Sequence, residues 1–573
     1  MLFSITVNNR KITAEKGETI LSALNRNGIN IPTLCRMKDF TPTGACRLCV
    51  VEVEGRENLV TACSEPVEEW MNIRTHSPRV IKARKTIVEL LLSKHPDECL
   101  FCINNLDCEL QRLAAELNIR ERRIKGRKIK PGIDQSGHSI VKELSKCVLC
   151  GRCVRVCEEL VTVSTLDFIN RGQKTRVGTS MNQDLNFTSC INCGQCVNVC
   201  PTGALHVKQN ITEVQEYLSN HDYLKVVQYS PMVPLAVAEE LGIKAPKDID
   251  RILNGILKKI GFNKVFLTGT GTDIMIEALA EEILKRTDAT DQSPLFVSAC
   301  PAWVKYAEQS LHDELENLSK LKPPQQITGS LIKTILSKQL GIKPQQIYSV
   351  SVTPCTAMKF EARRDSMMTK GICDVDSVLT VRELVKLIRL YGIDVSGTEG
   401  EAADEPLNVR SALSVLAEVS GGITESIVRK IFFRLTGKDA DRKMFRNIRS
   451  GGSFREAEFA PGGRKIAVAV VDGLSGLPRL YQSIASGRKY HIVEVMVCPG
   501  GCVNGAGLQV CMSKEELKNR VKQIYQTEES DILQIETFSR HLADFRGKYL
   551  DKDELLKDKK ILHTYFSKRD VLL

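Results

Sequence analysis

The segments CVLCGRCVRVC (residues 147–157) and CINCGQCVNVCP (residues 190–201) share one spacing, with cysteines at their first, fourth, seventh and eleventh positions. The chain has 573 residues and 21 cysteines, and 15 of these precede residue 201. Its first residues, MLFSITVNNRKITAEKGETI, lack the basic segment and the apolar run of a secretory signal. A reducing cytoplasm keeps thiols free to bind metal. The spacing therefore predicts iron–sulfur ligands in a cytoplasmic protein and not a disulfide framework.

The repeated spacing resembles that of bacterial two-cluster ferredoxins, in which the fourth cysteine of each run ligates the other cluster. This pattern predicts a domain at residues 139–209 that holds two [4Fe–4S] clusters. The predicted ligands of the first cluster are Cys147, Cys150, Cys153 and Cys200. The predicted ligands of the second cluster are Cys190, Cys193, Cys196 and Cys157.

Residues 1–78 carry a different cysteine spacing. The stretches SITV and KITA alternate apolar and polar residues as short strands do, and the helix-like stretch TILSALNRNG ends at Gly28. The cysteines that follow have the pattern C-x10-C-x2-C-x13-C and are Cys35, Cys46, Cys49 and Cys63. This pattern resembles plant-type [2Fe–2S] ferredoxins with a β-grasp fold, with a longer first gap. A zinc site is the alternative.

Residues 79–120 contain an apolar helical stretch, TIVELLLSKH, and one histidine with three cysteines: His95, Cys99, Cys102 and Cys108. Such a set could bind zinc. The spacing also resembles the His-ligated [4Fe–4S] site of the large iron–sulfur subunit of respiratory NADH dehydrogenase and of long-form hydrogenases. A position between two other cluster domains favours an iron–sulfur cluster.

The basic segment 121–138 links these domains, and the formal charge of the chain is +11. That charge counts every cysteine as neutral, whereas loaded clusters add negative charge on the order of −10. We therefore expect no nucleic-acid binding. The linker is predicted to be solvated or, alternatively, to form a docking surface for an acidic electron carrier. The sequence contains no apolar run of about 18 residues, so we expect no membrane span.

Residues 210–573 alternate apolar, β-branched runs with helical stretches, which predicts an α/β domain with largely parallel strands. The predicted strands are KVVQYS, KVFLTG, PLFVSA, IYSVSVTP, KIAVAVVDG and HIVEVMV. Cys300, Cys355 and Cys498 each follow one of these runs, and Cys502 lies in a Gly-rich turn. Ligands gather at the carboxyl ends of strands in open α/β sheets. Ordinary core cysteines are the alternative.

Three segments around these cysteines resemble the signature segments of [FeFe]-hydrogenases: SACPAW (298–303), TPCTAMKFE (353–361) and EVMVCPGGCVNGAG (494–507). The order of domains resembles the long monomeric clostridial form, so the similarity covers nearly the whole chain. The resemblance implies an H-cluster, whose [4Fe–4S] part is held by Cys300, Cys355, Cys498 and Cys502. The resemblance also implies that Cys502 bridges to a di-iron centre that carries CO, cyanide and an azadithiolate.

The resemblance thus implies one [2Fe–2S] cluster, three accessory [4Fe–4S] clusters and the H-cluster. These cofactors use 19 cysteines together with His95. Cys373 and Cys511 remain, and we expect both to be structural.

The chain departs from the family beside the implied di-iron centre. Ala299 replaces the cysteine that relays protons, and a methyl group can neither donate nor accept a proton. Met358 replaces the lysine that hydrogen-bonds a cyanide ligand, although Lys359 is retained next to it. Three further positions bear on this site: Thr353 in place of a Met, Met232 in place of a Ser, and the retained Met496.

Other family residues have counterparts here. Glu277 matches the inner carboxylate of the proton path, and Ser319 matches its hydroxyl; the alternative for each is a solvated helix face. The outer carboxylate falls at Ala280 with Glu281 adjacent, and Arg286 matches the outermost Arg. The residues implied to contact the cofactor are Ser230, Pro231, Gln325 and Lys359.

The resemblance implies the reaction 2 H⁺ + 2 e⁻ ⇌ H₂, with ferredoxin or a similar carrier as the electron partner and with maturation proteins that deliver the di-iron centre. Ala299 predicts slow or biased turnover in an anaerobic setting. One alternative is a hydrogen or redox sensor, because sensory branches of the family resemble this chain in carrying Ala at the relay position. Another is an iron–sulfur electron-transfer subunit of an NADH-linked or bifurcating complex.

Overall fold

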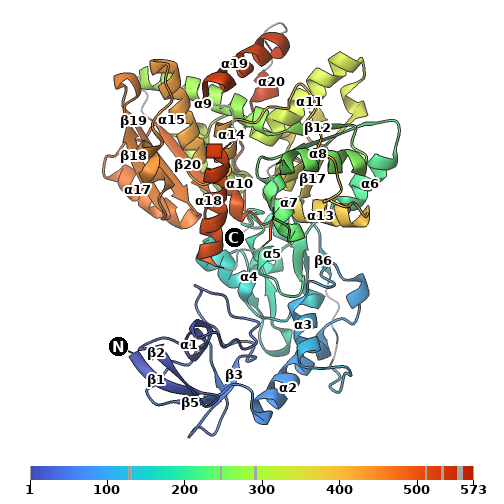
Figure 1. Ribbon diagram of the computed structural model, residues 1–573, viewed down its shortest axis with the longest axis vertical. Coiled ribbons are helices and arrows are strands. Elements are labelled where there is room, and N and C mark those ends of the chain that lie inside the picture. Colours follow the sequence, from blue (N-terminus) through green and yellow to red (C-terminus); the bar gives the residue numbers. More distant parts are fainter. Residues whose placement is uncertain are drawn as a thin grey trace.

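The computed structural model describes residues 2–126, 128, 132–244, 248–288, 293–297, 299–509, 513–530, 535–550 and 559–571. Figure 1 shows the N-terminal domains at one end of an elongated molecule and a larger C-terminal domain at the other, with the segment 139–209 between them. Within the described residues, no helix combines the length and the apolar content that crossing a bilayer requires.

The first domain is a five-stranded sheet in the order β2-β1-β5-β3-β4. β1 and β2 form an antiparallel hairpin, whereas β1 and β5 run parallel. Helix α1 begins where the Thr19 hydroxyl accepts a hydrogen bond from Ser22 N, and its apolar side chains pack onto the sheet. The elements are β1 Leu2–Val7, β2 Arg10–Glu15, α1 Ile20–Arg26, β3 Val50–Val53, β4 Val60–Thr61 and β5 Asn72–Arg74.

Two helices and a small sheet lead to the C-terminal domain. The second domain consists of α2 (Pro78–Lys94) and α3 (Glu109–Glu116). In the third, Gly151 and Gly194 have φ of 73° and 76° immediately before α4 and α5, a conformation that favours glycine. Its elements are β6 Ile133–Asp134, β7 Ile140–Glu143, α4 Arg152–Arg155, β8 Asp167–Ile169, β9 Arg176–Gly178, α5 Gln195–Asn198 and β10 Leu205–Val207.

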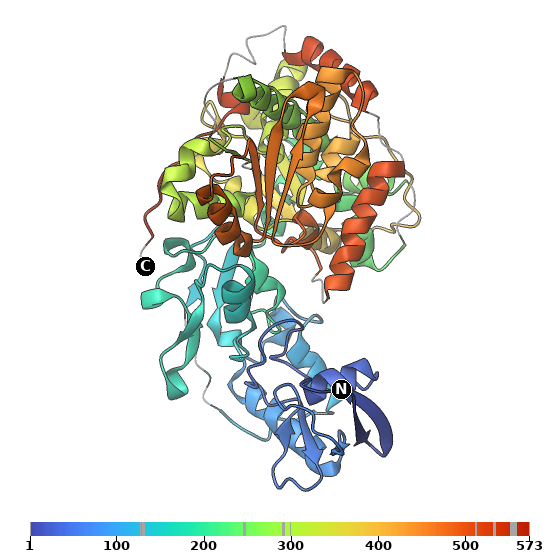
Figure 2. The same ribbon diagram turned by 90° about the vertical axis from the view of Figure 1, so that its left-hand side faces the viewer.

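The C-terminal domain contains two four-stranded sheets, in the orders β12-β11-β14-β17 and β13-β20-β19-β18. All neighbours in the first sheet are parallel, and in the second only β18 runs antiparallel to its neighbour. Figure 2 shows the second sheet between helices on either side. The strands are β11 Leu224–Tyr229, β12 Lys264–Leu267, β13 Leu295–Val297, β14 Ile347–Thr353, β17 Ser377–Thr380, β18 Phe454–Phe459, β19 Ile466–Asp472 and β20 Ile492–Met496. Two short strands, β15 Met368–Thr369 and β16 Ile372–Cys373, form a separate hairpin.

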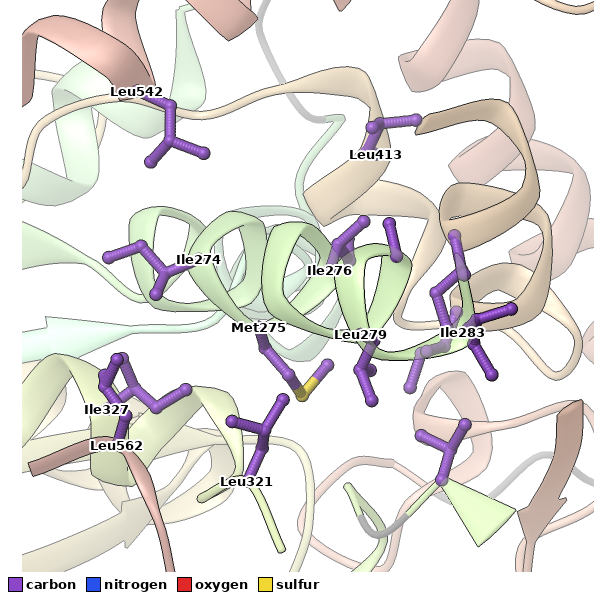
Figure 3. Close-up of a cluster of buried hydrophobic side chains, with 14 of the residues drawn as sticks. Ile274, Met275, Ile276, Leu279, Ile283, Leu321, Ile327, Leu413, Leu542 and Leu562 are labelled. Atoms are coloured by element: carbon purple, nitrogen blue, oxygen red, sulfur yellow. The ribbon is translucent and has the colours of Figure 1, made fainter. Parts of the chain in front are cut away.

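Helices cover these sheets. They are α6 Ile211–Ser219, α7 Val233–Leu241, α8 Ile249–Ile260, α9 Gly269–Asp288, α10 Pro301–Ser310, α11 Pro324–Leu340, α12 Ala357–Glu361, α13 Val381–Leu390, α14 Ala412–Leu416, α15 Gly422–Thr436, α16 Arg446–Arg449, α17 Leu477–Ala485, α18 Lys514–Ser530, α19 Ile535–Phe545 and α20 Lys559–Leu562. Figure 3 shows α9 within the largest apolar cluster, where Met275 and Leu279 point toward Leu321, and Ile276 lies on the side of Leu413.

The predicted fold class is confirmed: an α/β domain with largely parallel strands follows iron–sulfur domains. All six predicted strands of the C-terminal domain are present as β11, β12, β13, β14, β19 and β20. Strands β17 and β18 were not predicted. β17 has only four residues, and β18 (FREAEF) carries charges at an antiparallel edge, so neither reads as a long apolar run.

Candidate metal centre

The four cysteines of the first domain meet in one place. Cys35, Cys49 and Cys63 are each at most 2% exposed. Hydrogen bonds from Cys46 and Cys63 lower the pKa of the Cys35 thiol, and a hydrogen bond from Cys63 lowers the pKa of Cys49 to about 7. Sulfur atoms in mutual contact form a donor set that fits a [2Fe–2S] cluster.

Cys99, Cys102 and Cys108 act on one another, and Lys146 lies within electrostatic reach of both Cys102 and His95. Burial, followed by the positive charge of Lys146, lowers the pKa of the His95 imidazole to about 4, so the ring is neutral at pH 7 and able to bind metal. Its Nδ1 has no hydrogen-bond partner in the described part of the chain. Burial raises the pKa of Cys108, and the charges of Cys102 and Cys99 add to this shift. The donor set therefore fits a metal cluster.

The two cysteine runs of the third domain exchange their last members. Burial raises the pKa of Cys153, and the charges of Cys150, Cys200 and Cys147 raise it further. Cys200 therefore lies with the first run, as the ferredoxin-like spacing predicts.

The reciprocal exchange appears at the second run. Burial raises the pKa of Cys196, and the charges of Cys193, Cys190 and Cys157 add to this, so Cys157 lies with the second run. The charge of Cys153 also acts on Cys196, which places the two sites next to each other. The assignment of ligands to clusters stays a prediction.

The last four cysteines come from the ends of strands in both large sheets. Cys300 follows β13 and begins α10, Cys355 follows β14, and Cys498 and Cys502 follow β20. Burial raises the pKa of Cys355, and the charges of Cys498 and Cys300 add to this effect. Cys300, Cys355 and Cys498 likewise act on Cys502. Four thiols that face one another at strand ends form a donor set that fits a [4Fe–4S] cluster.

Two cysteines were predicted to be structural and not ligands. Cys373 belongs to β16, in the short hairpin with β15. Cys511 lies outside the residues that the structure describes.

Gln195 joins the C-terminal four cysteines to the third domain. Its Nε2 donates to Cys498 Sγ at 3.1 Å and to Asn504 O at 2.9 Å. Thr356 Oγ1 donates to Cys193 O at 3.1 Å, and the charge of Cys498 acts on the Cys193 thiol. The second ferredoxin-like site therefore adjoins the C-terminal four cysteines. Sequence reasoning missed Gln195, because its role depends on a contact between distant segments.

A further apolar cluster joins the three N-terminal sites. Cys46 of the first domain, Cys108 of the second and Val148 of the third all pack against one group of buried residues: Leu34, Leu48, Val88, Leu110 and Leu113. The sites are thus arranged in contact from the N-terminal domains to the C-terminal one.

Several residues predicted to surround the cofactor are buried near the C-terminal cysteines. Thr353 is 3% exposed, and its hydroxyl accepts a hydrogen bond from Cys355 N at 3.2 Å. Gln325 Nε2 donates to Met358 O at 3.3 Å, and its Oε1 has no partner within the described ranges. Pro231 and Met496 are buried, whereas Ala299 and Met358 are half-buried. The unpartnered buried oxygen of Gln325, whose amide nitrogen reaches Met358 O, fits a site built around a further group.

Lys359 was predicted to contact the cofactor, and in this structure its ammonium group has protein partners. Its Nζ donates to Asn210 Oδ1 at 2.6 Å, to Val378 O at 2.8 Å and to Glu383 Oε1 at 3.0 Å. An ammonium group has three N–H donors, and these partners use all of them. Lys359 therefore ties α12 to α13 and α6 and has no donor left for a cyanide ligand.

Glu277 and Ser319 were predicted to belong to one proton path. In the structure the Glu277 side chain points toward α15. Its carboxylate pairs with Lys430 at 2.7 Å and with Arg434, both on α15. Residue 277 lies about 200° around the helix from Met275, because each residue advances an α-helix by roughly 100°. Met275 and Leu279 point toward Leu321 in Figure 3, and Ser319 lies two residues before Leu321 with its hydroxyl accepting from Leu321 N.

The face of α9 that packs toward Leu321 is thus apolar. Ala280 is fully buried, Glu281 lies 3.7 Å from Arg434, and Arg286 pairs with Glu282 at 3.1 Å. The Glu277 carboxylate is thus engaged by α15 in this structure, and its role in a proton path stays a prediction.

Two buried acids near the site were not singled out from the sequence. Burial raises the pKa of Glu361 to about 8, and Gln325 Nε2 donates to its Oε2 at 2.8 Å. Burial also raises the pKa of Glu418 to about 7, and the neighbouring Ser230 hydroxyl opposes that shift. A glutamate far from any ligand motif gives no sequence signal, so only the fold brings Glu418 to the site.

Glu361 predicts a pH dependence of stability. Its pKa is about 8 in the folded protein against an ordinary value of 4.5, so the folded state keeps a proton that the unfolded state loses. The contribution of Glu361 to the free energy of unfolding is fully present below about pH 4.5. It falls as the pH rises to about 8, by up to about 1.4 kcal/mol per pH unit. Glu361→Gln should flatten this slope in denaturant unfolding between pH 6 and pH 8. Equal slopes in both proteins would contradict the prediction.

Comparison with known families matches four successive parts of the chain. A 2Fe-2S iron-sulfur cluster binding domain matches residues 2–78, and the NADH-ubiquinone oxidoreductase-G iron-sulfur binding region matches 84–123. A 4Fe-4S dicluster domain matches 121–210, and the iron only hydrogenase large subunit, C-terminal domain, matches 224–506. The predicted 2Fe-2S and 4Fe-4S domains are thereby confirmed.

Full-length relatives agree with these matches. The chain is 35% identical to the NADP-reducing hydrogenase subunit HndD of Solidesulfovibrio fructosivorans over all of both chains. It is 32% identical to iron hydrogenase 1 of Clostridium pasteurianum over 91% of each chain. A structure of apo [FeFe]-hydrogenase HydA1 from Chlamydomonas reinhardtii, determined on a variant of that enzyme, matches 64% of this chain and all of that chain, with a TM-score of 0.56 and 26% identity.

Proposed function

Because this chain belongs to the iron-only hydrogenase family, we propose that it interconverts H₂ with protons and electrons at a metal centre held by four C-terminal cysteines. The proposed ligands are Cys300, Cys355, Cys498 and Cys502. The observation that carries the proposal is the meeting of these thiols at strand ends, directly beside the second ferredoxin-like site through Gln195. When bound, an H-cluster supplies an open iron position and a bridging amine at which H₂ is split.

The residues of this chain set how fast that site works. The Ala299 side chain has no exchangeable proton, and the apolar Met275 and Leu279 line the face of α9 toward Leu321. Proton delivery is therefore the slow step that we propose, and turnover is low or biased. A protein that keeps the metal ligands and restricts proton access is also suited to sensing H₂.

The N-terminal sites form the proposed electron path. The proposed ligands are Cys35, Cys46, Cys49 and Cys63 for a [2Fe–2S] cluster, and His95, Cys99, Cys102 and Cys108 for a [4Fe–4S] cluster. The exchanged sets of the third domain hold two more. The apolar group around Leu34 and the Gln195 contact support this order, because electron tunnelling needs short distances.

The electron partner is proposed as ferredoxin or as a subunit that handles NAD(P)H. The second option rests on a specific observation: the relative HndD, a subunit of an NADP-reducing hydrogenase, matches this chain along its entire length. Purification of the native protein together with any proteins bound to it would distinguish the two partners. A stable flavoprotein is expected to co-purify only if the chain is a subunit of a complex.

The central test is to load the protein with a synthetic di-iron cofactor under anaerobic conditions. We expect infrared bands of bound CO and cyanide, together with slow H₂ evolution from reduced viologen. Bands with no turnover would favour the sensor, and absence of the bands would remove the proposed metal centre. Cys502→Ala is the control, because it keeps the N-terminal clusters and removes one proposed ligand.

If the two cysteine runs of the third domain exchange ligands, Cys200→Ser and Cys157→Ser should each remove a different cluster. Cys200→Ser should remove about four iron atoms and one [4Fe–4S] signal while leaving the site beside Cys498 intact. Cys157→Ser is the matched control and should remove the site beside Cys498 instead. Iron content and electron paramagnetic resonance of the reduced proteins measure both. The opposite pattern would mean that each run binds its own cluster.

A further inference from the structure

Two buried arginines lack the carboxylate partners that the other buried arginines of this chain have. Arg84 on α2 and Arg155 on α4 are 1% and 5% exposed, and within the described residues neither forms an ion pair with a carboxylate. The others are paired: Arg152 with Glu109, Arg364 with Glu308, Arg429 with Asp439, Arg455 with Asp472 and Arg520 with Glu239. An isolated charge is costly to bury, so Arg84 and Arg155 indicate a negative group beside them.

Arg84 reaches the cysteines of the first domain from α2. Its Nη2 donates to Val50 O at 2.8 Å, and Val50 directly follows Cys49. Its Nε has no hydrogen-bond partner in the part of the chain that the structure describes. Burial lowers the pKa of Arg84 to about 10, and the charge of Cys49 opposes that shift. The guanidinium therefore stays charged at pH 7 and lies beside the proposed [2Fe–2S] site.

Arg155 reaches the same site from the third domain. Its Nη2 donates to Cys35 O, and its Nη1 donates to Thr41 O at 2.6 Å. Its Nε likewise has no partner among the described residues. Glu159, four residues further along the chain, accepts from Thr41 N at 3.3 Å. Backbone carbonyls satisfy hydrogen bonds but carry no net charge, so these contacts leave the charge of Arg155 unbalanced.

The proposed cluster supplies the negative charge that both arginines need. A [2Fe–2S] cluster held by four thiolates is negatively charged, and its reduction adds one electron. Nearby positive charge favours the more negative, reduced form, because net charge and hydrogen bonds around a cluster set its potential. Arg84 belongs to the second domain and Arg155 to the third, so both cations are in place only when the three domains pack together.

We propose that Arg84 and Arg155 are fixed countercharges of the [2Fe–2S] cluster and raise its reduction potential. This inference deepens the proposed electron path and rests on it, because it needs that cluster. Both residues act on the charge of the cluster and on none of its bonds. The [2Fe–2S] site is thereby set to accept electrons at the N-terminal end of the path, and this setting depends on the docking of the three N-terminal domains.

The test is a redox titration of the full, cluster-loaded chain at pH 7, in which electron paramagnetic resonance reports the reduced [2Fe–2S] cluster. Arg84→Met keeps an apolar stem and removes the charge. At the wild-type midpoint potential we expect its reduced-to-oxidised ratio to fall about tenfold. For a one-electron couple this change equals a midpoint lower by about 59 mV. Arg155→Met should lower the midpoint to a similar extent.

Two control variants separate charge from packing. Arg84→Lys keeps a cation, so its reduced-to-oxidised ratio should stay within about threefold of the wild type. Arg520→Met removes a buried arginine that is already paired with Glu239 in the C-terminal domain, and it should leave the [2Fe–2S] midpoint unchanged. The [4Fe–4S] signals of the third domain serve as an internal reference for Arg84→Met, because that substitution lies outside their domain.

Arg155→Met and Arg84→Lys keep the proposal testable even if Arg84→Met does not fold. The same [2Fe–2S] midpoint in the wild type, Arg84→Met and Arg155→Met would overturn the proposal. An Arg84→Lys midpoint as low as that of Arg84→Met would also overturn it, since charge would then not be the cause. Absence of a [2Fe–2S] signal from the loaded wild type would instead overturn the proposed electron path.

Discussion

Ala299→Cys is expected to raise H₂ turnover by about a hundredfold or more. A positioned acid or base accelerates proton transfer by roughly 10²–10⁴, and Ala299 supplies none. Ala299 directly precedes Cys300 and is half-buried, so a thiol at this position would lie next to the metal site. H₂ evolution from reduced viologen, measured per loaded cofactor, provides the readout.

Ala299→Ser is the matched control for this gain. A hydroxyl is similar in size to a thiol but is a much weaker acid, so we expect only a small increase. A solvent isotope effect that shrinks in Ala299→Cys would identify proton delivery as the step that became faster. If the Cys variant were no faster than the wild type, the missing thiol at position 299 would not be what limits the rate.

Lys359→Met is expected to destabilise the C-terminal domain by about 3–5 kcal/mol. The Lys359 and Glu383 side chains are 2% and 1% exposed, and removing one partner leaves the other as an uncompensated buried charge. Glu383 also caps α13 through Thr380, so the loss reaches a second helix. Anaerobic denaturant unfolding followed by circular dichroism measures the change.

The infrared spectrum separates this structural role from cofactor binding. Cyanide bands of loaded Lys359→Met should match those of the wild type, because Nζ has no donor free for the cofactor. The double variant Lys359→Met with Glu383→Leu should recover part of the lost stability, since it removes both charges. Normal stability with displaced cyanide bands would show that Lys359 contacts the cofactor after all.

Local patterns were sufficient for much of the fold. β-Branched runs such as KIAVAVVDG and HIVEVMV became β19 and β20, because such residues suit strands buried on both faces. The pattern could not reveal that the strands divide between two sheets, with Cys355 at the end of one and Cys300 and Cys498 at the end of the other. That division depends on packing between segments far apart in sequence.

The sequence by itself indicated the kinds and the order of the iron–sulfur domains. Covalent geometry keeps cysteines with a short spacing such as C-x2-C close together in space. Such a run therefore predicts a metal site wherever the fold places it. Only the tertiary structure decided what single long side chains do. The position of Glu277 around α9 directs its side chain toward α15. Lys359 Nζ donates to three segments that meet only in the folded chain. Glu418 likewise lies next to Cys502 only in the folded chain, because the sequence of neither turn predicts that the two turns approach each other.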